Sequence, residues 1–399
     1  MIFKVKNFLL LFLLMLPLAN LPQLLNIGED TGAIALSLII IPLFLIWLVL
    51  EKKIYIPKIP YNKTLLLIVL LGSVLTFISI ILNKIPLIEG IKVLVQFSIA
   101  KFIYLYLIII IAEKVSFSQA LRLLQLFSYI VLASLLLSIP LYYLNPVPEF
   151  VFYDGGTRFA GFHFELVNYS FVVLLCFFIH SYFKGFSKLK LLLLLCFLYL
   201  TARSNAFYPF VGIALFSAIA GYYNRLTIQK ILIVFILFIT PLIGIFLEYF
   251  SFLEVFALRG ATSFSLEGSQ LFIRLYPWAL AMQHFINTFN FLPLGLGTLS
   301  ISPYITDTEN LFGGTGITAI IAEYGSISLL LLPFIYLFFS NILTNILIIK
   351  EANSRMCLCA MLLLSLTYIC IQSGFFNLTT WTVCIILQTI ALKYPKSNL

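Results

Sequence analysis

The chain has 399 residues, of which 62% are hydrophobic and only 10% are charged. An average soluble domain carries about 25% charged residues, so this composition excludes a water-soluble globular protein. The net charge of +9 comes from basic residues scattered between apolar runs. Because they form no continuous basic stripe, we expect no nucleic-acid partner.

Apolar runs of about 18 residues or more recur along the chain, as in membrane-spanning helices. The strict alternation of outer-membrane barrel strands is absent. We therefore predict an all-α, polytopic membrane protein of about twelve transmembrane helices, with residues 1–399 forming a single integral membrane domain. The expected spans are 8–25, 33–50, 64–82, 93–112, 121–144, 164–183, 190–205, 206–222, 231–248, 316–342, 356–374 and 376–393.

The positions of lysine and arginine predict the orientation of these spans. With the N-terminus in the cytoplasm, most of the 24 basic residues fall in cytoplasmic segments, which satisfies the positive-inside rule. Of the 15 acidic residues, only Glu51, Glu113 and Glu351 lie on that side. An even number of spans then places both termini in the cytoplasm.

Two of the expected periplasmic segments, 145–163 and 249–315, are longer than a simple connection. Helix connections in bundles usually take about 2–8 residues, so loops of this length indicate function. In the second loop, apolar residues recur at helical spacing from 269 to 289. We predict an amphipathic helix there, lying on or dipping into the outer membrane surface.

Arginine dominates the basic residues of the periplasmic side, at Arg158, Arg203, Arg259 and Arg274. The planar guanidinium group binds phosphate through two hydrogen bonds and stays charged, which suits a phosphate clamp at a membrane surface. The alternative is that each arginine snorkels to the interface or pairs with the acidic residues of that side. For the set as a whole, the clamp is the favoured interpretation.

The acidic and histidine side chains of the same side are candidates for acid–base chemistry. Glu165 and Glu323 lie at the external ends of expected spans, and His163 precedes Glu165 by two residues. Each could accept a proton from a substrate hydroxyl, although a lone loop histidine is more often not catalytic. His284 falls on the expected interfacial helix and could share a cavity with Arg274.

Lys101 lies in the middle of an expected span, where a charge is costly and often functional, although it could equally snorkel. The glycines of 293–297, 313–316 and 325 favour turns and close helix packing, because no strand precedes them and no Gly-Lys-Ser/Thr follows. The chain contains no recognisable metal-binding or nucleotide-binding motif. We therefore expect no metal and no cofactor.

Five motifs in a fixed order resemble one known group of proteins. They are Gly156–Glu165, Thr201–Ser204, Arg274–Leu280, Pro293–Gly297 and Ala322–Gly325. This ordered set resembles the O-antigen polymerase and ligase superfamily and covers about residues 150–335. The first third of the chain matches that superfamily only in hydropathy.

The resemblance implies a metal-independent glycosyltransferase of the bacterial inner membrane. Its substrate would be an oligosaccharide on undecaprenyl diphosphate, presented at the periplasmic face of the lipid bilayer, and a chain-length regulator protein would be a further partner. In the implied site, the diphosphate clamp consists of Arg158, Arg203, Arg274 and Arg259. The candidates for acid–base catalysis are Glu323, His163 and Glu165. The candidates for substrate binding are His284 and Tyr324.

Within the superfamily, the residues before Gly325 favour a polymerase. Ligases of the superfamily carry a histidine followed by Asn, Ser or Gln about ten residues before the late glycine, and this chain has Gly314 and Thr315 at those two places. One alternative is an O-antigen ligase. Another is a flippase for lipid-linked oligosaccharides, and a flippase should carry charges deep in many spans and consist of two related halves. An assembly partner without catalysis is a third.

Overall fold

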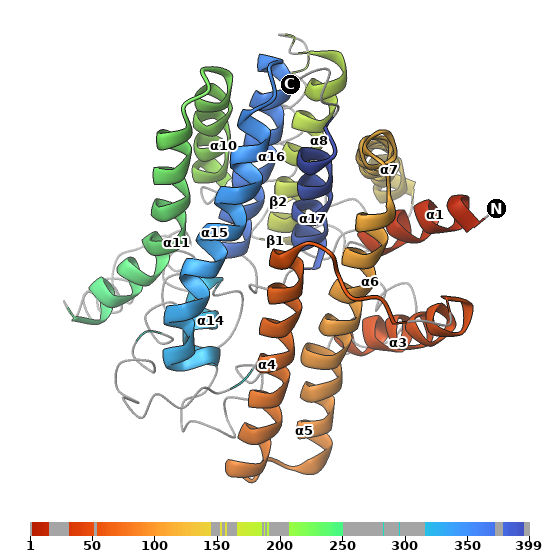
Figure 1. Ribbon diagram of the computed structural model, residues 1–399, viewed down its shortest axis with the longest axis vertical. Helices are drawn as coiled ribbons and strands as arrows, with labels where there is room; N and C mark the ends of the chain where they lie inside the picture. Colours follow the sequence, from red (N-terminus) through yellow and green to blue (C-terminus); the bar gives the residue numbers. More distant parts are fainter. Residues whose placement is uncertain are drawn as a thin grey trace.

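The computed structural model describes residues 2–15, 32–51, 54–144, 152–153, 156–157, 166–185, 187, 190, 207–249, 282, 295, 316–371 and 378–394. Helices make up all of its regular structure except one short pair of strands (Figure 1). The helices of the first half are α1 (Ile2–Met15), α3 (Gly32–Glu51), α4 (Pro60–Leu82), α5 (Leu87–Val93), the π-helix η3 (Leu94–Ile99), α6 (Ala100–Lys114), α7 (Phe117–Leu144) and α8 (Leu166–Lys184). Those of the second half are α10 (Phe207–Tyr222), α11 (Leu226–Tyr249), α14 (Ile317–Tyr324), the 3-10 helix η6 (Gly325–Ile327), α15 (Ser328–Leu347), α16 (Ala352–Ile371) and α17 (Leu378–Leu392).

The predicted all-α class is confirmed for the described residues. Every expected span except 190–205 overlaps at least one of these helices, and most of 190–205 lies outside the described residues. Within the part of the chain that the structure describes, five helical stretches are long and apolar enough to cross a membrane: Pro60–Leu82, Leu87–Lys114, Leu226–Phe246, Ile317–Leu347 and Ala352–Ile371. A protein with this many such helices has the make-up of a polytopic membrane protein.

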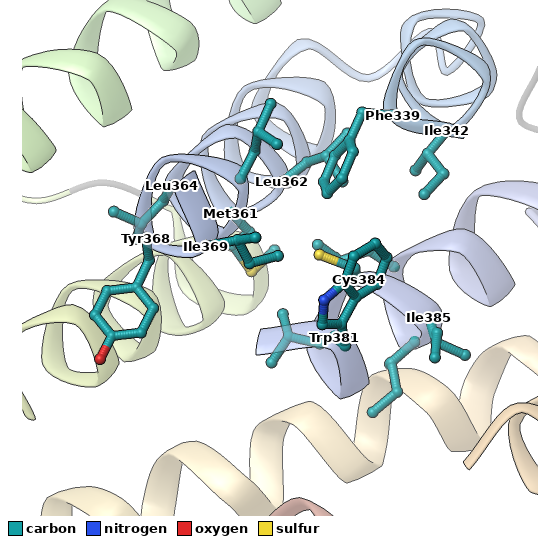
Figure 2. Packing of buried hydrophobic residues seen from close by; sticks show 14 of the residues in the cluster. Phe339, Ile342, Met361, Leu362, Leu364, Tyr368, Ile369, Trp381, Cys384 and Ile385 are labelled. Carbon is teal, nitrogen blue, oxygen red and sulfur yellow. The ribbon is translucent and has the colours of Figure 1, made fainter. Parts of the chain in front are cut away.

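Helices α16 and α17 form the centre of the bundle. Every residue from Leu378 to Ala391 of α17 is buried, and so is every residue from Cys357 to Cys370 of α16. A helix that is apolar on all sides is expected in such a position. Figure 2 shows residues of α15, α16 and α17 packed together there, with Trp381 of α17 against Phe339 of α15 and ring centroids 6.0 Å apart.

Helices α4 and α11 are instead peripheral. Only 44% of the apolar window of α4 and 39% of that of α11 is buried, against 83% for α16. Their exposed residues are large and apolar, such as Leu67 and Phe77 on α4 and Phe235 on α11. Exposed apolar surface of this extent would be unstable in water, so these two faces suit contact with lipid.

A carboxylate from α6 caps the start of α4. The N-cap residue of α4, Ile59, has no side chain able to accept the free N–H groups of the first turn. Glu113 accepts hydrogen bonds from the N–H groups of Lys58 (2.7 Å) and Ile59 (3.2 Å), and from the side-chain amide of Asn62 (3.1 Å). The negative charge also opposes the positive end of the α4 dipole.

The same end of the bundle gathers segments predicted to face the cytoplasm. Lys393, after α17, donates to the carbonyl of Glu113 at 2.8 Å, and Tyr394 packs edge-on against Phe117, with centroids 5.1 Å apart. Lys114 lies 3.4 Å from the Glu51 carboxylate. We call this end, marked by Lys58, Lys114, Arg355 and Lys393, the basic face.

Arg355 joins two turns of the basic face. Its guanidinium donates to the carbonyls of Gly221 (3.2 Å) and Tyr222 (3.0 Å) at the end of α10. It also donates to the carbonyls of Ile349 (2.7 Å) and Lys350 (2.8 Å), between α15 and α16. Carbonyls at helix ends lack intrahelical partners, so one side chain satisfies two helix termini at once.

We expect Arg355→Ala to destabilise the protein by about 1–3 kcal/mol, because several helix-terminal carbonyls lose a charged donor. The exposed Arg122 of α7, replaced by alanine, is the matched control and should have little effect. Thermal unfolding in detergent measures both. Equal melting temperatures for the two variants would contradict this role of Arg355.

A short hairpin lies within the first long loop. Strands β1 (Phe152–Tyr153) and β2 (Gly156–Thr157) pair antiparallel, with Phe152 opposite Thr157 and Tyr153 opposite Gly156. The sequence analysis did not predict it. Arg158 follows β2 directly, so the hairpin fixes the backbone immediately before that arginine.

Candidate functional site

Helix α14 carries two of the predicted site residues, Glu323 and Tyr324, and a glycine bounds it at each end. Gly316 has φ 57° and ψ −125°, and Gly325 has φ 54° and ψ −134°. Residues with a Cβ atom rarely adopt this region, so both bends require glycine. The two glycines thereby set α14 apart from the chain before it and from α15 after it.

Two glycines in this region bring backbones into direct contact. A Cβ atom on Gly316 would lie 2.1 Å from the carbonyl oxygen of Cys370 on α16. A Cβ atom on Gly295 would lie 2.3 Å from the backbone nitrogen of Thr76 on α4. The prediction that these glycines serve turns and close helix packing is confirmed for Gly295, Gly316 and Gly325.

Gly295 links the second long loop to α14. Its N–H donates to the carbonyl oxygen of Glu323 at 2.8 Å. Gly295 and Glu323, which belong to two of the five motifs noted in the sequence, therefore touch each other in space. The side chain of Glu323 is buried, with 7% of the residue exposed.

Hydroxyl groups from α4 and η3 lie next to this contact. Thr76 Oγ1 donates to the carbonyl of Gly72 at 2.8 Å and lies 3.3 Å from Ser98 Oγ. Either of these two hydroxyls can donate to the other. Ser98 belongs to the π-helix η3, a wide helical turn that is frequent at functional sites.

Lys101 completes this group. It follows η3 on α6, it is partly buried, and the Glu323 carboxylate acts electrostatically on its ammonium group. The helical run is continuous from Leu87 to Lys114, so the span begins earlier than the predicted 93–112. Lys101 is therefore far inside the span. We call Thr76, Ser98, Lys101, Glu323 and the Gly295 backbone the polar cluster.

The polar cluster lies far from the basic face. At about 1.5 Å per residue, Lys101 is about 20 Å from Lys114 along α6, and Thr76 is about 24 Å from Pro60 along α4. The apolar core of a bilayer is about 30 Å thick. In a membrane-spanning bundle these distances place the polar cluster in the half opposite the basic face. Figure 1 agrees, with α14 low in the view and the α10–α11 and α15–α16 turns at the top.

Tyr324 packs between helices. Its ring is fully buried, and its hydroxyl donates to the carbonyl of Ile68 on α4 at 3.0 Å. This hydrogen bond ties α14 to α4 about two turns nearer the start of α4 than the contact between Gly295 and Thr76. The proposal that Tyr324 binds substrate stays a prediction, and in this arrangement its hydroxyl joins two helices.

The remaining predicted site residues fall outside the described residues: Arg158, Arg203, Arg259, Arg274, His163, Glu165 and His284. Of the expected interfacial helix 269–289, the structure describes Met282, which is helical and 3% exposed. Among the described residues, no three His, Cys, Asp or Glu side chains are grouped so that they could hold a metal ion. The polar cluster offers one buried carboxylate, one ammonium group and two hydroxyls.

Lys101 and Glu323 are more than two hundred positions apart, and no sequence pattern predicted a link between them. Thr76 and Ser98 were not predicted either, because a single hydroxyl residue in an apolar span is common and rarely functional. Comparison with known proteins adds no assignment: no protein-family profile, no curated protein and no solved structure matches the chain.

We expect Gly295→Ala and Gly316→Ala to lower the melting temperature clearly, because the added methyl overlaps backbone atoms of α4 and α16 and the positive φ disfavours alanine. Gly212, inside α10, has no atom within 4 Å of an added Cβ and serves as the control. Gly212→Ala should keep or raise stability, since alanine is favoured over glycine in a helix by about 1 kcal/mol. Similar melting temperatures for all three variants would contradict the close contacts.

Proposed function

We propose that the chain is a polymerase for a bacterial surface polysaccharide such as O-antigen, with about twelve spans in the inner membrane and both termini in the cytoplasm. It would transfer the growing glycan from undecaprenyl diphosphate to the non-reducing end of a new lipid-linked repeat unit. The observation that carries the proposal is the polar cluster. It joins two of the resembling motifs around a buried carboxylate, in the half of the bundle opposite the basic face.

The reaction assigns a role to each group of residues. Glu323 takes the proton of the acceptor hydroxyl while that oxygen forms a bond to the anomeric carbon of the donor. The bond from that carbon to the diphosphate oxygen breaks, and the electron pair leaves with undecaprenyl diphosphate. Arg158, Arg203 and Arg274, with Arg259, stabilise the charge on the leaving diphosphate.

Three further candidates complete the proposed site. His163 and Glu165 follow Arg158 in the same motif, so either could share the proton transfer or orient the acceptor. His284 would contact the glycan from the long loop. The charge distribution supports the orientation, since the positive-inside rule assigns the basic face to the cytoplasm and the polar cluster to the periplasmic half.

We expect purified protein, given lipid-linked repeat units alone, to make longer lipid-linked glycans without nucleotide sugar or ATP. Glu323→Gln, Arg158→Ala, Arg203→Ala and Arg274→Ala should each reduce the rate by about 10²–10³, as for other groups that stabilise developing charge or move a proton. Gel analysis of the lipid-linked products measures the rate, and the Gly212→Ala protein is the matched control.

The products of this assay also distinguish a polymerase from a ligase and from a flippase. Transfer of glycan to a lipid A core acceptor without elongation would identify a ligase. Movement of lipid-linked units across a vesicle membrane, with no new glycosidic bond, would identify a flippase. If the folded wild-type protein does not elongate lipid-linked units, the proposal that the chain is a polymerase is wrong.

Reporter fusions test the proposed orientation. Fusions after residues 57, 187, 227 and 396 should report a cytoplasmic position, because they fall in the lysine-containing segments. Fusions after residues 155 and 285 should report a periplasmic position. A cytoplasmic signal at 285 would place the long loop on the wrong side for a periplasmic substrate and would exclude the proposed reaction.

A further inference from the structure

Lys101 and Glu323 are opposite charges held deep within an apolar bundle. A contact chain joins their helices: Ser98, on the turn before Lys101, contacts Thr76 at 3.3 Å, and the Thr76 backbone abuts Gly295. Gly295 in turn donates to the carbonyl of Glu323 at 2.8 Å. Packing thus brings the segments that carry Lys101 and Glu323 into one region, where their opposite charges interact.

We propose that Lys101 is a positioning residue for Glu323, holding its carboxylate ionised and oriented for proton transfer. This inference rests on the proposed function, in which Glu323 is the base. It assigns to Lys101 a role that none of the five motifs contains, since Lys101 lies in the first third of the chain.

The physical need for Lys101 comes from the low polarity of the site. A buried carboxylate without a partner takes up a proton, and a protonated acid cannot act as a base. A nearby ammonium group favours the ionised carboxylate, and the interaction is stronger in a medium of low dielectric constant than in water.

The helices packed against α14 supply the remaining charges of this environment. These helices are α4, α11, α15 and α16. No charged residue occurs in α15 from Ser328 to Leu347. The charged residues of the other three helices lie near helix ends: Lys63, Lys230, Glu248 and Arg355. Among the described residues, Lys101 is therefore the cation best placed to balance Glu323.

Both residues lie beside a departure from regular α-helical geometry. Lys101 lies on α6, two residues after the last residue of the π-helix η3, and Glu323 lies on α14 between two glycine bends. Attraction between the two charges fixes the register of α6 against α14 at the place where the acceptor hydroxyl must arrive.

The test compares four variants in the elongation assay: Lys101→Met, Lys101→Arg, the charge exchange Lys101→Glu with Glu323→Lys, and Lys92→Met. Methionine keeps the length of the side chain without its charge, and arginine keeps the charge. Lys92 lies on the same span, is half-exposed and faces Glu89 at 3.9 Å, so it controls for loss of a positive charge. Turnover (kcat), KM for the lipid-linked unit and melting temperature are measured for each.

We expect Lys101→Met to lower kcat by about 100-fold, the lower end of what a general base contributes, with KM little changed. Lys101→Arg should recover most of the turnover, and Lys92→Met should match the wild type. The charge exchange should recover the melting temperature lost in Lys101→Met, because the pair is restored, but no turnover, because lysine replaces the base.

Wild-type kcat in Lys101→Met would overturn the proposal. Turnover regained by the charge exchange would also overturn it, since the pair would then be structural and Glu323 would not be the base. If the wild type itself does not elongate lipid-linked units, the proposed function fails and the positioning role fails with it. The melting temperatures of Lys101→Met and of the charge exchange then show separately whether the two charges interact.

Discussion

The close approach of glycine backbones to neighbouring helices is the constraint on which the polar cluster depends. Gly295 abuts the α4 backbone at Thr76, and Gly316 abuts the α16 backbone at Cys370. A larger residue at either place would force the two backbones apart, because its Cβ atom would lie 2.3 Å or 2.1 Å from a backbone atom of the neighbouring helix. The hydrogen bond from Gly295 to the carbonyl of Glu323 would then be disturbed. The chemistry proposed for the site thus depends on residues that have no side chain.

Because the polar cluster is buried, its charged groups are costly unless they have partners. Ionised groups inside an apolar bundle are unfavourable unless they are paired or hydrogen-bonded, and breaking such a pair leaves one charge without compensation. The hydroxyls of Thr76 and Ser98 and the N–H of Gly295 provide polar neighbours in the same small volume. A polar site within an apolar bundle therefore needs several helices to contribute to it, and the polar cluster draws its residues from α4, η3, α6 and α14.

The sequence was sufficient to predict the helices, because an apolar run long enough to cross a bilayer allows few other structures. The sequence also indicated that the late glycines allow turns and close helix packing, because they lack the flanking residues of a phosphate-binding loop. The link between Lys101 and Glu323 could not be predicted, because hydropathy gives the depth of a residue but not the helix it faces. The β1–β2 hairpin was missed because two-residue strands leave no periodic pattern. The arginines lie outside the described residues, so their convergence remains a prediction.

The π-helix η3 has a consequence for how this chain can vary. A π turn accommodates one more residue than an α turn, so the residues after it are rotated by about 100° relative to an uninterrupted helix. Loss or gain of a single residue within Leu94–Ile99 would leave the span almost equally long and equally apolar. It would nevertheless turn the whole following face of α6 toward different neighbours. In this stretch an insertion or deletion acts as a rotation, and a sequence alignment scored on hydropathy alone would not register the difference.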